Sequence, residues 1–96
     1  MTLREFQEHI DKTYGQRDCA RGADATFRRL VEEVGELARA LRDGDRGRLE
    51  EEFGDVLAWT VTLASLAGID AHRAASRYEA GCPRCGATPC VCPSSA

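Results

Sequence analysis

The sequence lacks the features that several protein classes require. It has no apolar stretch near the roughly twenty residues of a membrane helix, and no positively charged start followed by an apolar run. We therefore expect no membrane partner and a cytoplasmic location. The formal net charge of -3 provides no basic surface for a nucleic-acid polymer. No strand pattern, internal repeat or low-complexity run competes with an all-α reading.

The composition indicates a folded chain with a modest core. The 96 residues are 43% hydrophobic and 30% charged, which is typical of a globular domain and not of a disordered one. A chain of this length holds one domain at most and has little apolar surplus. Oligomerisation is therefore expected to add to its stability.

Helical periodicity and capping signals predict a bundle of about four helices. The expected helices run from Leu3 to Tyr14, from Asp24 to Asp43, from near Arg48 to Gly68, and from Asp70 to Gly81. Residues 15–22 have no periodic apolar signal and are expected to form a loop near the acidic helices. The second helix should pack through a single apolar stripe that consists of Phe27, Leu30, Val31, Val34, Leu37, Ala38 and Leu41. After Trp59 the third helix is apolar nearly all round, which predicts burial on both sides or a subunit contact.

Two acidic clusters lie on the second and third expected helices. Glu33 and Glu36 are one turn apart, as are Glu52 and Asp55, and winding at about 100° per residue places both pairs on matching flanks of the apolar stripes. Glu32 points largely outward. When the stripes pack, four partly desolvated carboxylates would face one another, which requires a cation.

The ligand types indicate a hard metal ion. Oxygen ligands without nearby His or Cys favour Mg²⁺ or Mn²⁺ over Zn²⁺. Gly35 and Gly54 lie inside the acidic motifs and suggest close approach by a ligand or a neighbouring helix. The alternative is a solvated acidic face that pairs with nearby arginines.

The acidic motifs, Glu-Glu-x-x-Glu at residues 32–36 and Glu-x-x-Asp at residues 52–55, resemble those of the MazG-like nucleoside triphosphate pyrophosphohydrolases. The resemblance implies an all-α fold, assembly into homodimers or homotetramers, and Mg²⁺-dependent cleavage of a nucleotide substrate, an NTP or dNTP, to the monophosphate and pyrophosphate. Carried over position by position, it implies Glu33, Glu36, Glu52 and Asp55 as metal ligands. It also implies Glu32 as an additional ligand or a base that orients water. Hydrolysis needs a carboxylate that takes the proton from the attacking water, and Glu32 and Glu36 are the candidates for this catalytic role.

The chain departs from this family in its phosphate-contacting residues. Related sequences usually carry a lysine and an asparagine on the helix after the second motif, but this chain has no Asn and its only lysine is Lys12. Arg73 and Arg77 are the nearest candidates for phosphate contact, and Trp59 and Tyr78 for stacking on a base. The alternatives are exposed solubilising charges for the arginines and a core position for Trp59.

The C-terminal segment is rich in cysteine. Cys82, Cys85, Cys90 and Cys92 form a C-x-x-C unit followed by C-x-C, a set of thiolates that suits a tetrahedral structural Zn²⁺. The alternative is a flexible tail with free or oxidised thiols. We expect a helical domain over residues 1–80, a zinc knuckle over 81–93 and a disordered tail over 94–96.

Two other functions remain open at this point. One is an enzyme of the same fold with a related substrate, such as the phosphoribosyl-ATP of histidine synthesis. The other is a non-catalytic helical interaction module with a zinc knuckle, which the missing Lys and Asn would favour. A pyrophosphate-release screen separates the three.

Overall fold

The chain folds into four α-helices and a short 3₁₀ turn, and the computed structural model describes residues 1–94. In chain order these are α1 (Leu3–Arg21), α2 (Ala23–Asp43), α3 (Arg46–Leu66), α4 (Ala71–Ala75) and the 3₁₀ turn Ser76–Tyr78. No strand occurs among the described residues, so the predicted all-α fold of about four helices is confirmed. Most of the expected disordered tail, residues 95–96, lies outside the described part of the chain.

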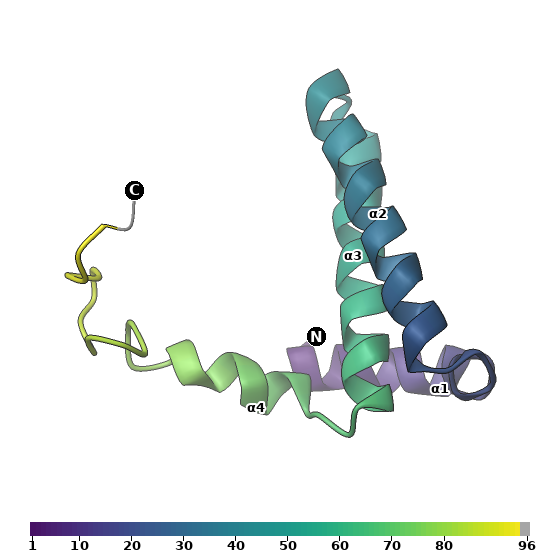
Figure 1. The fold of residues 1–96 in the computed structure, drawn as a ribbon, viewed down its shortest axis with the longest axis horizontal. Coiled ribbons are helices and arrows are strands. Elements are labelled where there is room, and N and C mark those ends of the chain that lie inside the picture. The colour runs from purple at the N-terminus through teal and green to yellow at the C-terminus, as the bar shows by residue number, and fades with distance from the viewer. Residues whose placement is uncertain (95–96) are drawn as a thin grey trace.

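α2 and α3 form a helical hairpin, α1 lies across its base, and α4 extends away from the base to one side (Figure 1). Only two residues connect the hairpin: Gly44, which ends α2 in the left-handed conformation at φ 74°, and Asp45, which caps α3 by accepting the N–H of Gly47 at 3.1 Å. The arrangement is open. Its radius of gyration is 15.7 Å, whereas a compact chain of this length would have about 12.5 Å.

The prediction of a loop over residues 15–22 is wrong, because α1 continues unbroken to Arg21. The last turns of α1 bury a polar group instead of an apolar one: Asp18 is 5% exposed and accepts a hydrogen bond from Arg21 at 2.9 Å. Gly22, at φ 84°, ends α1 and starts α2 directly. Asp24 therefore lies in the first turn of α2 and is not its N-cap.

The apolar stripe predicted for α2 is divided between two faces. The more buried face consists of Thr26, Leu30, Glu33, Leu37 and Ala40. The outer face leaves four large apolar side chains about half exposed, namely Phe27, Val31, Val34 and Leu41. On α3, Phe53 and Leu57 are 50% and 53% exposed. The expected single core stripe is therefore wrong, and in the described residues only Ala40 and Val61 are fully buried apolar side chains.

The second half of α3 is not enclosed by its own chain. After Trp59 only Val61 and Thr62 are buried, whereas Leu63 and Leu66 are half-buried. A single chain therefore does not bury both sides of this half of α3, although such burial was expected from its apolar sequence.

Gln7 joins α1 to the turn between α3 and α4. Its side chain is 8% exposed, donates to Ser65 Oγ and to the Ile69 carbonyl at 2.9 Å each, and accepts the N–H of Ala71 at 2.8 Å. Asp70 caps α4 as predicted by accepting a backbone N–H at 2.9 Å. These bonds set the direction in which α4 leaves the hairpin.

α4 turns sharply away from α3. The bend between α3 and the Ala71–Tyr78 segment is 109°. Within residues 1–94 no single helix is long and apolar enough to cross a membrane, although this bent pair meets that test jointly by length and composition.

Candidate functional site

Three acidic side chains meet where α2 and α3 pack together. Glu33 and Glu36 project from α2 and Glu52 from α3, and each offers a carboxylate oxygen within 4.8 Å of the other two. Residues three apart on a helix share a face, and the two-residue connection fixes how the two helices are aligned. The structure thus brings together three of the four predicted ligands, and their binding of a metal stays a prediction.

Two of these carboxylates are buried without a full set of partners. Glu33 is 9% exposed and Glu52 is 8% exposed, and the Oε2 atom of each has no hydrogen-bond partner. Arg29 Nη2 lies 3.6 Å from Glu33 Oε1, so this ion pair partners only one of the four carboxylate oxygens of Glu33 and Glu52. Buried carboxylate oxygens are normally hydrogen-bonded or coordinated to a cation. The orphaned oxygens are therefore a fit for a hard divalent ion.

Asp55 lies at the open edge of this cluster. It is exposed, and it is not one of the three residues whose oxygens converge. Burial raises the pKa of Glu33 above its ordinary value, and the charges of Asp55, Glu36 and Glu52 raise this pKa further against the opposing effect of Arg29. Asp55 follows Glu52 by one turn of α3, so both carboxylates project from the same side of that helix.

A pocket of about 270 Å³ opens beside Asp55 between α1 and α3. Its charged and aromatic lining consists of Tyr14, Arg17, Asp18, Arg21, Asp55 and Trp59. The segment 15–21 therefore borders this pocket, as part of a helix and not as the predicted loop. Because Asp55 lines the pocket and lies one turn after Glu52 on α3, the pocket opens beside the acidic cluster.

Two arginines lie on the ring of Trp59. The guanidinium carbon of Arg21 is 4.7 Å from the ring centroid and that of Arg29 is 5.3 Å from it. Arg21 also donates to Asp18 and, at 3.1 Å, to Thr26 Oγ1, so its position is fixed from several sides. Cation–π contacts of this kind hold a positive charge in a defined place. Trp59 therefore positions arginines beside the acidic cluster.

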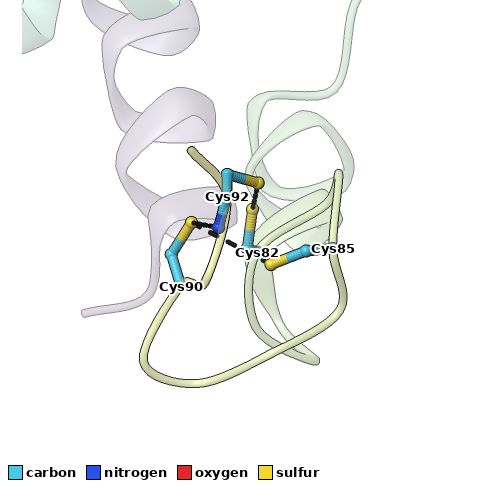
Figure 2. A group of neighbouring side chains, drawn as sticks. All are labelled: Cys82, Cys85, Cys90 and Cys92. Carbon is cyan, nitrogen blue, oxygen red and sulfur yellow. Dashed lines mark hydrogen bonds between the residues drawn. The ribbon is translucent and has the colours of Figure 1, made fainter. Parts of the chain in front are cut away.

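The cysteine-rich tail forms a second cluster beyond α4. Cys82, Cys85, Cys90 and Cys92 each place a sulfur within 4.8 Å of the other three (Figure 2). The fifth cysteine, Cys19, is exposed on α1 and is not part of this group. The cluster could bind a metal ion through sulfur alone.

Comparison with known proteins identifies the helical part of the chain. A family model described as the MazG nucleotide pyrophosphohydrolase domain matches residues 21–80. The chain belongs to the MazG family. An uncharacterized protein of Bacillus subtilis (strain 168), YpjD, is 34% identical over 87 residues, which cover 79% of this chain and 78% of YpjD. The predicted family is therefore confirmed, and with it a hydrolase fold of the nucleotide pyrophosphohydrolase type.

The MazG match includes the acidic motifs and Trp59 but excludes the cysteine cluster and most of α1. Arg17 and Asp18, which line the pocket, thus lie outside the matched range. The division into a domain over residues 1–80 and a knuckle over 81–93 stays a prediction.

Glu32, one of the two predicted catalytic residues of this MazG domain, lies outside the converging group. Its side chain is 60% exposed and its Oε2 accepts a hydrogen bond from Arg29 at 2.8 Å. This agrees with the outward direction inferred from helix winding. Glu36 is in the group and is 46% exposed, which leaves it accessible to water.

Three of the predicted substrate-binding residues lie on the α4 side of the molecule. Arg73 and Arg77 line a separate pocket with Ile69 and Asp70 at the far end of α3. Tyr78 is 61% exposed, and the Arg77 guanidinium lies 5.3 Å from its ring centroid. Within one chain these residues do not join the pocket that contains Trp59 and Asp55.

Sequence reasoning missed the basic side of the pocket, which comes from α1. Arg17, Asp18 and Arg21 lie in the segment that was predicted to be a loop, so no side-chain direction could be assigned to them. The spacing of Asp18 and Arg21, one turn apart and oppositely charged, is the signal that would have favoured a helix there.

Proposed function

We propose that this MazG-family protein hydrolyses nucleoside triphosphates, NTPs or dNTPs, to the monophosphate and pyrophosphate with the help of Mg²⁺. The observation that carries the proposal is the pair of orphaned oxygens on Glu33 and Glu52 beside a pocket with arginines. Such a site combines cation-binding groups with positive charge for a polyphosphate, which is what hydrolysis of a phosphoric anhydride requires.

The metal would be held by Glu33, Glu36 and Glu52, with Asp55 at the open edge. Oxygen-only ligands select Mg²⁺, or Mn²⁺ in its place. When bound, the ion neutralises phosphate oxygens and polarises the phosphorus for attack. The buried positions of Glu33 and Glu52 make them the fixed part of the site, and the more exposed Glu36 and Asp55 face the substrate.

We assign the proton-accepting role to Glu36. Water oxygen attacks the α-phosphorus, the bond from that phosphorus to the bridging oxygen breaks, and pyrophosphate leaves with the bond electrons. One water proton passes to the Glu36 carboxylate. Glu32 is the weaker candidate because its carboxylate is already bonded to Arg29 at 2.8 Å and lies outside the cluster.

The arginines beside Trp59 would take the role of the missing Lys and Asn. Arg21 and Arg29 lie on the Trp59 ring next to the acids, and Arg17 lines the same pocket. Among the described residues Arg17 has no salt-bridge partner, so its charge is available to a phosphate. Arginine suits phosphate oxygens because its guanidinium forms paired hydrogen bonds.

We further propose that a second copy of the chain covers the outer face of the hairpin, giving a homodimer or homotetramer. Six large apolar side chains are about half exposed there, namely Phe27, Val31, Val34, Leu41, Phe53 and Leu57. One shallow pocket is lined by both Leu41 and Phe53, so the two helices share this face. A patch of this size on a small chain is typical of a subunit contact.

A pyrophosphate-release assay tests the proposed activity. The full chain is incubated with NTPs, dNTPs, damaged nucleotides or phosphoribosyl-ATP, each with Mg²⁺ or Mn²⁺. We expect release with Mg²⁺ and a loss of about 100-fold or more in Glu52→Gln. Glu51→Gln is the matched control, because Glu51 is its exposed neighbour on the same helix and should retain activity.

The outcomes separate the alternatives. Release from phosphoribosyl-ATP alone would assign the enzyme to histidine synthesis. No release from any substrate with either ion would refute the hydrolase and favour a non-catalytic helical module. Because its substrates are metabolites of the cell interior, the proposed activity places the protein in the cytoplasm, with no nucleic-acid polymer as partner.

A further inference from the structure

The sulfur atoms of the tail are spaced for a shared ion. Cys82 Sγ and Cys92 Sγ are 3.8 Å apart, and Cys85 Sγ and Cys90 Sγ are 3.9 Å apart. A tetrahedron with zinc–sulfur bonds of about 2.3 Å has edges of about 3.8 Å. A disulfide instead needs sulfurs about 2.05 Å apart. The observed separations therefore fit four ligands around one centre.

The tail keeps this shape without an apolar core. Val91, its one large aliphatic side chain, is 72% exposed. Two backbone bonds close the loop: Gly86 N–H donates to the Cys82 carbonyl at 2.7 Å, and Cys82 N–H donates to the Ala87 carbonyl at 3.0 Å. Because apolar burial does not offset the entropy of ordering residues 81–92, another source of binding energy is needed at the cysteines.

Gly81 shows that the loop is closely built. Its φ of 110° disfavours any other residue, and a Cβ atom there would lie 2.6 Å from Thr88 Oγ1. The far side of the loop therefore packs directly onto the backbone where the tail begins. This contact brings the C-x-C unit back against the C-x-x-C unit.

A backbone amide points at one of the sulfurs. Cys92 N–H donates to Cys90 Sγ at 3.4 Å. Amide groups that point at thiolates are the usual second shell of a structural zinc knuckle.

We propose that Cys82, Cys85, Cys90 and Cys92 bind one structural Zn²⁺ ion, separate from the carboxylate site. The ion takes four thiolates, the remaining thiol protons pass to solvent, and no electron is transferred. Four sulfur ligands leave no coordination position for water or substrate, so this site has no catalytic step of its own. Its effect is to fold a tail that lies beyond α4 and outside the matched MazG residues.

The test is metal analysis of the full chain, purified with reductant and without added metal. We expect one zinc per chain in the parent, in Cys19→Ser and in Glu52→Gln, and none in the double variant Cys90→Ser/Cys92→Ser. Cys19 is the matched control because it is the one cysteine outside the cluster. Co²⁺ added to zinc-stripped protein should give the intense charge-transfer and visible bands of a four-thiolate tetrahedral site.

Four results would overturn the proposal. Three of them are reduced protein with four titratable tail thiols and no stoichiometric zinc, stoichiometric iron in place of zinc, and zinc that remains in the Cys90→Ser/Cys92→Ser variant. If Glu52→Gln lost the zinc, the ion would lie at the carboxylates and the tail assignment would fail. None of these results changes the pyrophosphate-release assay, so the two proposals fail independently.

Discussion

Replacing Glu33 by glutamine is expected to stabilise the metal-free protein, although it removes a predicted ligand. Glu33 is 9% exposed and shares a 4.8 Å cluster with two other carboxylates. At an effective dielectric constant of about 20, two charges at that distance repel by about 3.5 kcal/mol. Solvent around the more exposed Glu36 reduces this repulsion, and the glutamine amide stays partly unpaired. We therefore expect the free energy of unfolding to rise by about 1–2 kcal/mol at pH 7.

The assay is urea and thermal unfolding, followed by circular dichroism at one fixed protein concentration, in EDTA and then in Mg²⁺. In EDTA the Glu33→Gln midpoint should rise by about 5–10 °C. Glu32→Gln is the control, because this exposed residue forms a surface ion pair and its loss should cost at most about 1 kcal/mol. At a Mg²⁺ concentration 100 times the Kd, the free energy of unfolding of the parent should rise by about 2.7 kcal/mol. That of the variant should not rise.

The raised pKa of the Glu33 carboxyl also makes the stability of the metal-free protein depend on pH. The raised pKa of Glu33 means that the folded, metal-free protein binds this proton more tightly than the unfolded chain does. Its stability therefore falls as pH rises from the ordinary value of 4.5 through the raised folded value. Glu33→Gln should remove this part of the pH dependence. A variant less stable than the parent in EDTA, or stabilised equally by Mg²⁺, would refute the argument.

Three further predictions concern other parts of the molecule. Gln7→Met, which removes three hydrogen bonds from a buried side chain, should lower the free energy of unfolding by about 2–4 kcal/mol in urea titrations. Trp59→Leu, which removes the ring beneath two arginines, should raise KM about 5- to 20-fold. The control Tyr78→Leu should leave KM unchanged. An unaltered KM in Trp59→Leu would contradict the assignment of the arginines to phosphate binding. Val34→Glu should convert the oligomer to a monomer in light-scattering measurements, and an unchanged mass would show that the outer face of the hairpin is not the contact.

The helices and the phase of the acids could be predicted because local rules decide them. The Thr2 capping box, the Asp70 cap and the Gly44 terminus all depend on residues within one turn. The convergence of Glu33, Glu36 and Glu52 follows from helix winding once the two apolar helices are paired.

The remaining features depend on contacts that no local rule contains. α1 continues past Tyr14 because Asp18 and Arg21 pack in its last turns, where an apolar pattern would normally be required. Periodicity also could not separate the two faces of α2, because both are apolar and only the packing of α3 shows which one is covered. The positions of Arg73 and Arg77 depend on the direction of α4, which Gln7 sets from a distant part of the chain.

Glycines inside the acidic motifs were expected to allow close approach by a ligand or a helix. A Cβ atom at Gly35 or Gly54 would meet nothing within 4 Å, so no other helix of the same chain approaches them. Approach by a ligand or by a second copy stays a prediction.

The two faces of α2 have a consequence for how the enzyme responds to dilution. Glu33 on the more buried face of α2 and Val34 on its outer face are consecutive residues. A rotation of the helix that moves one side chain therefore also moves the other. If a second copy packs on this outer face, dissociation would leave the carboxylates in each chain but would remove the contact that fixes the orientation of α2 and of Glu33. Turnover per chain would then drop below a threshold protein concentration, and mixing inactive chains that still associate would restore it.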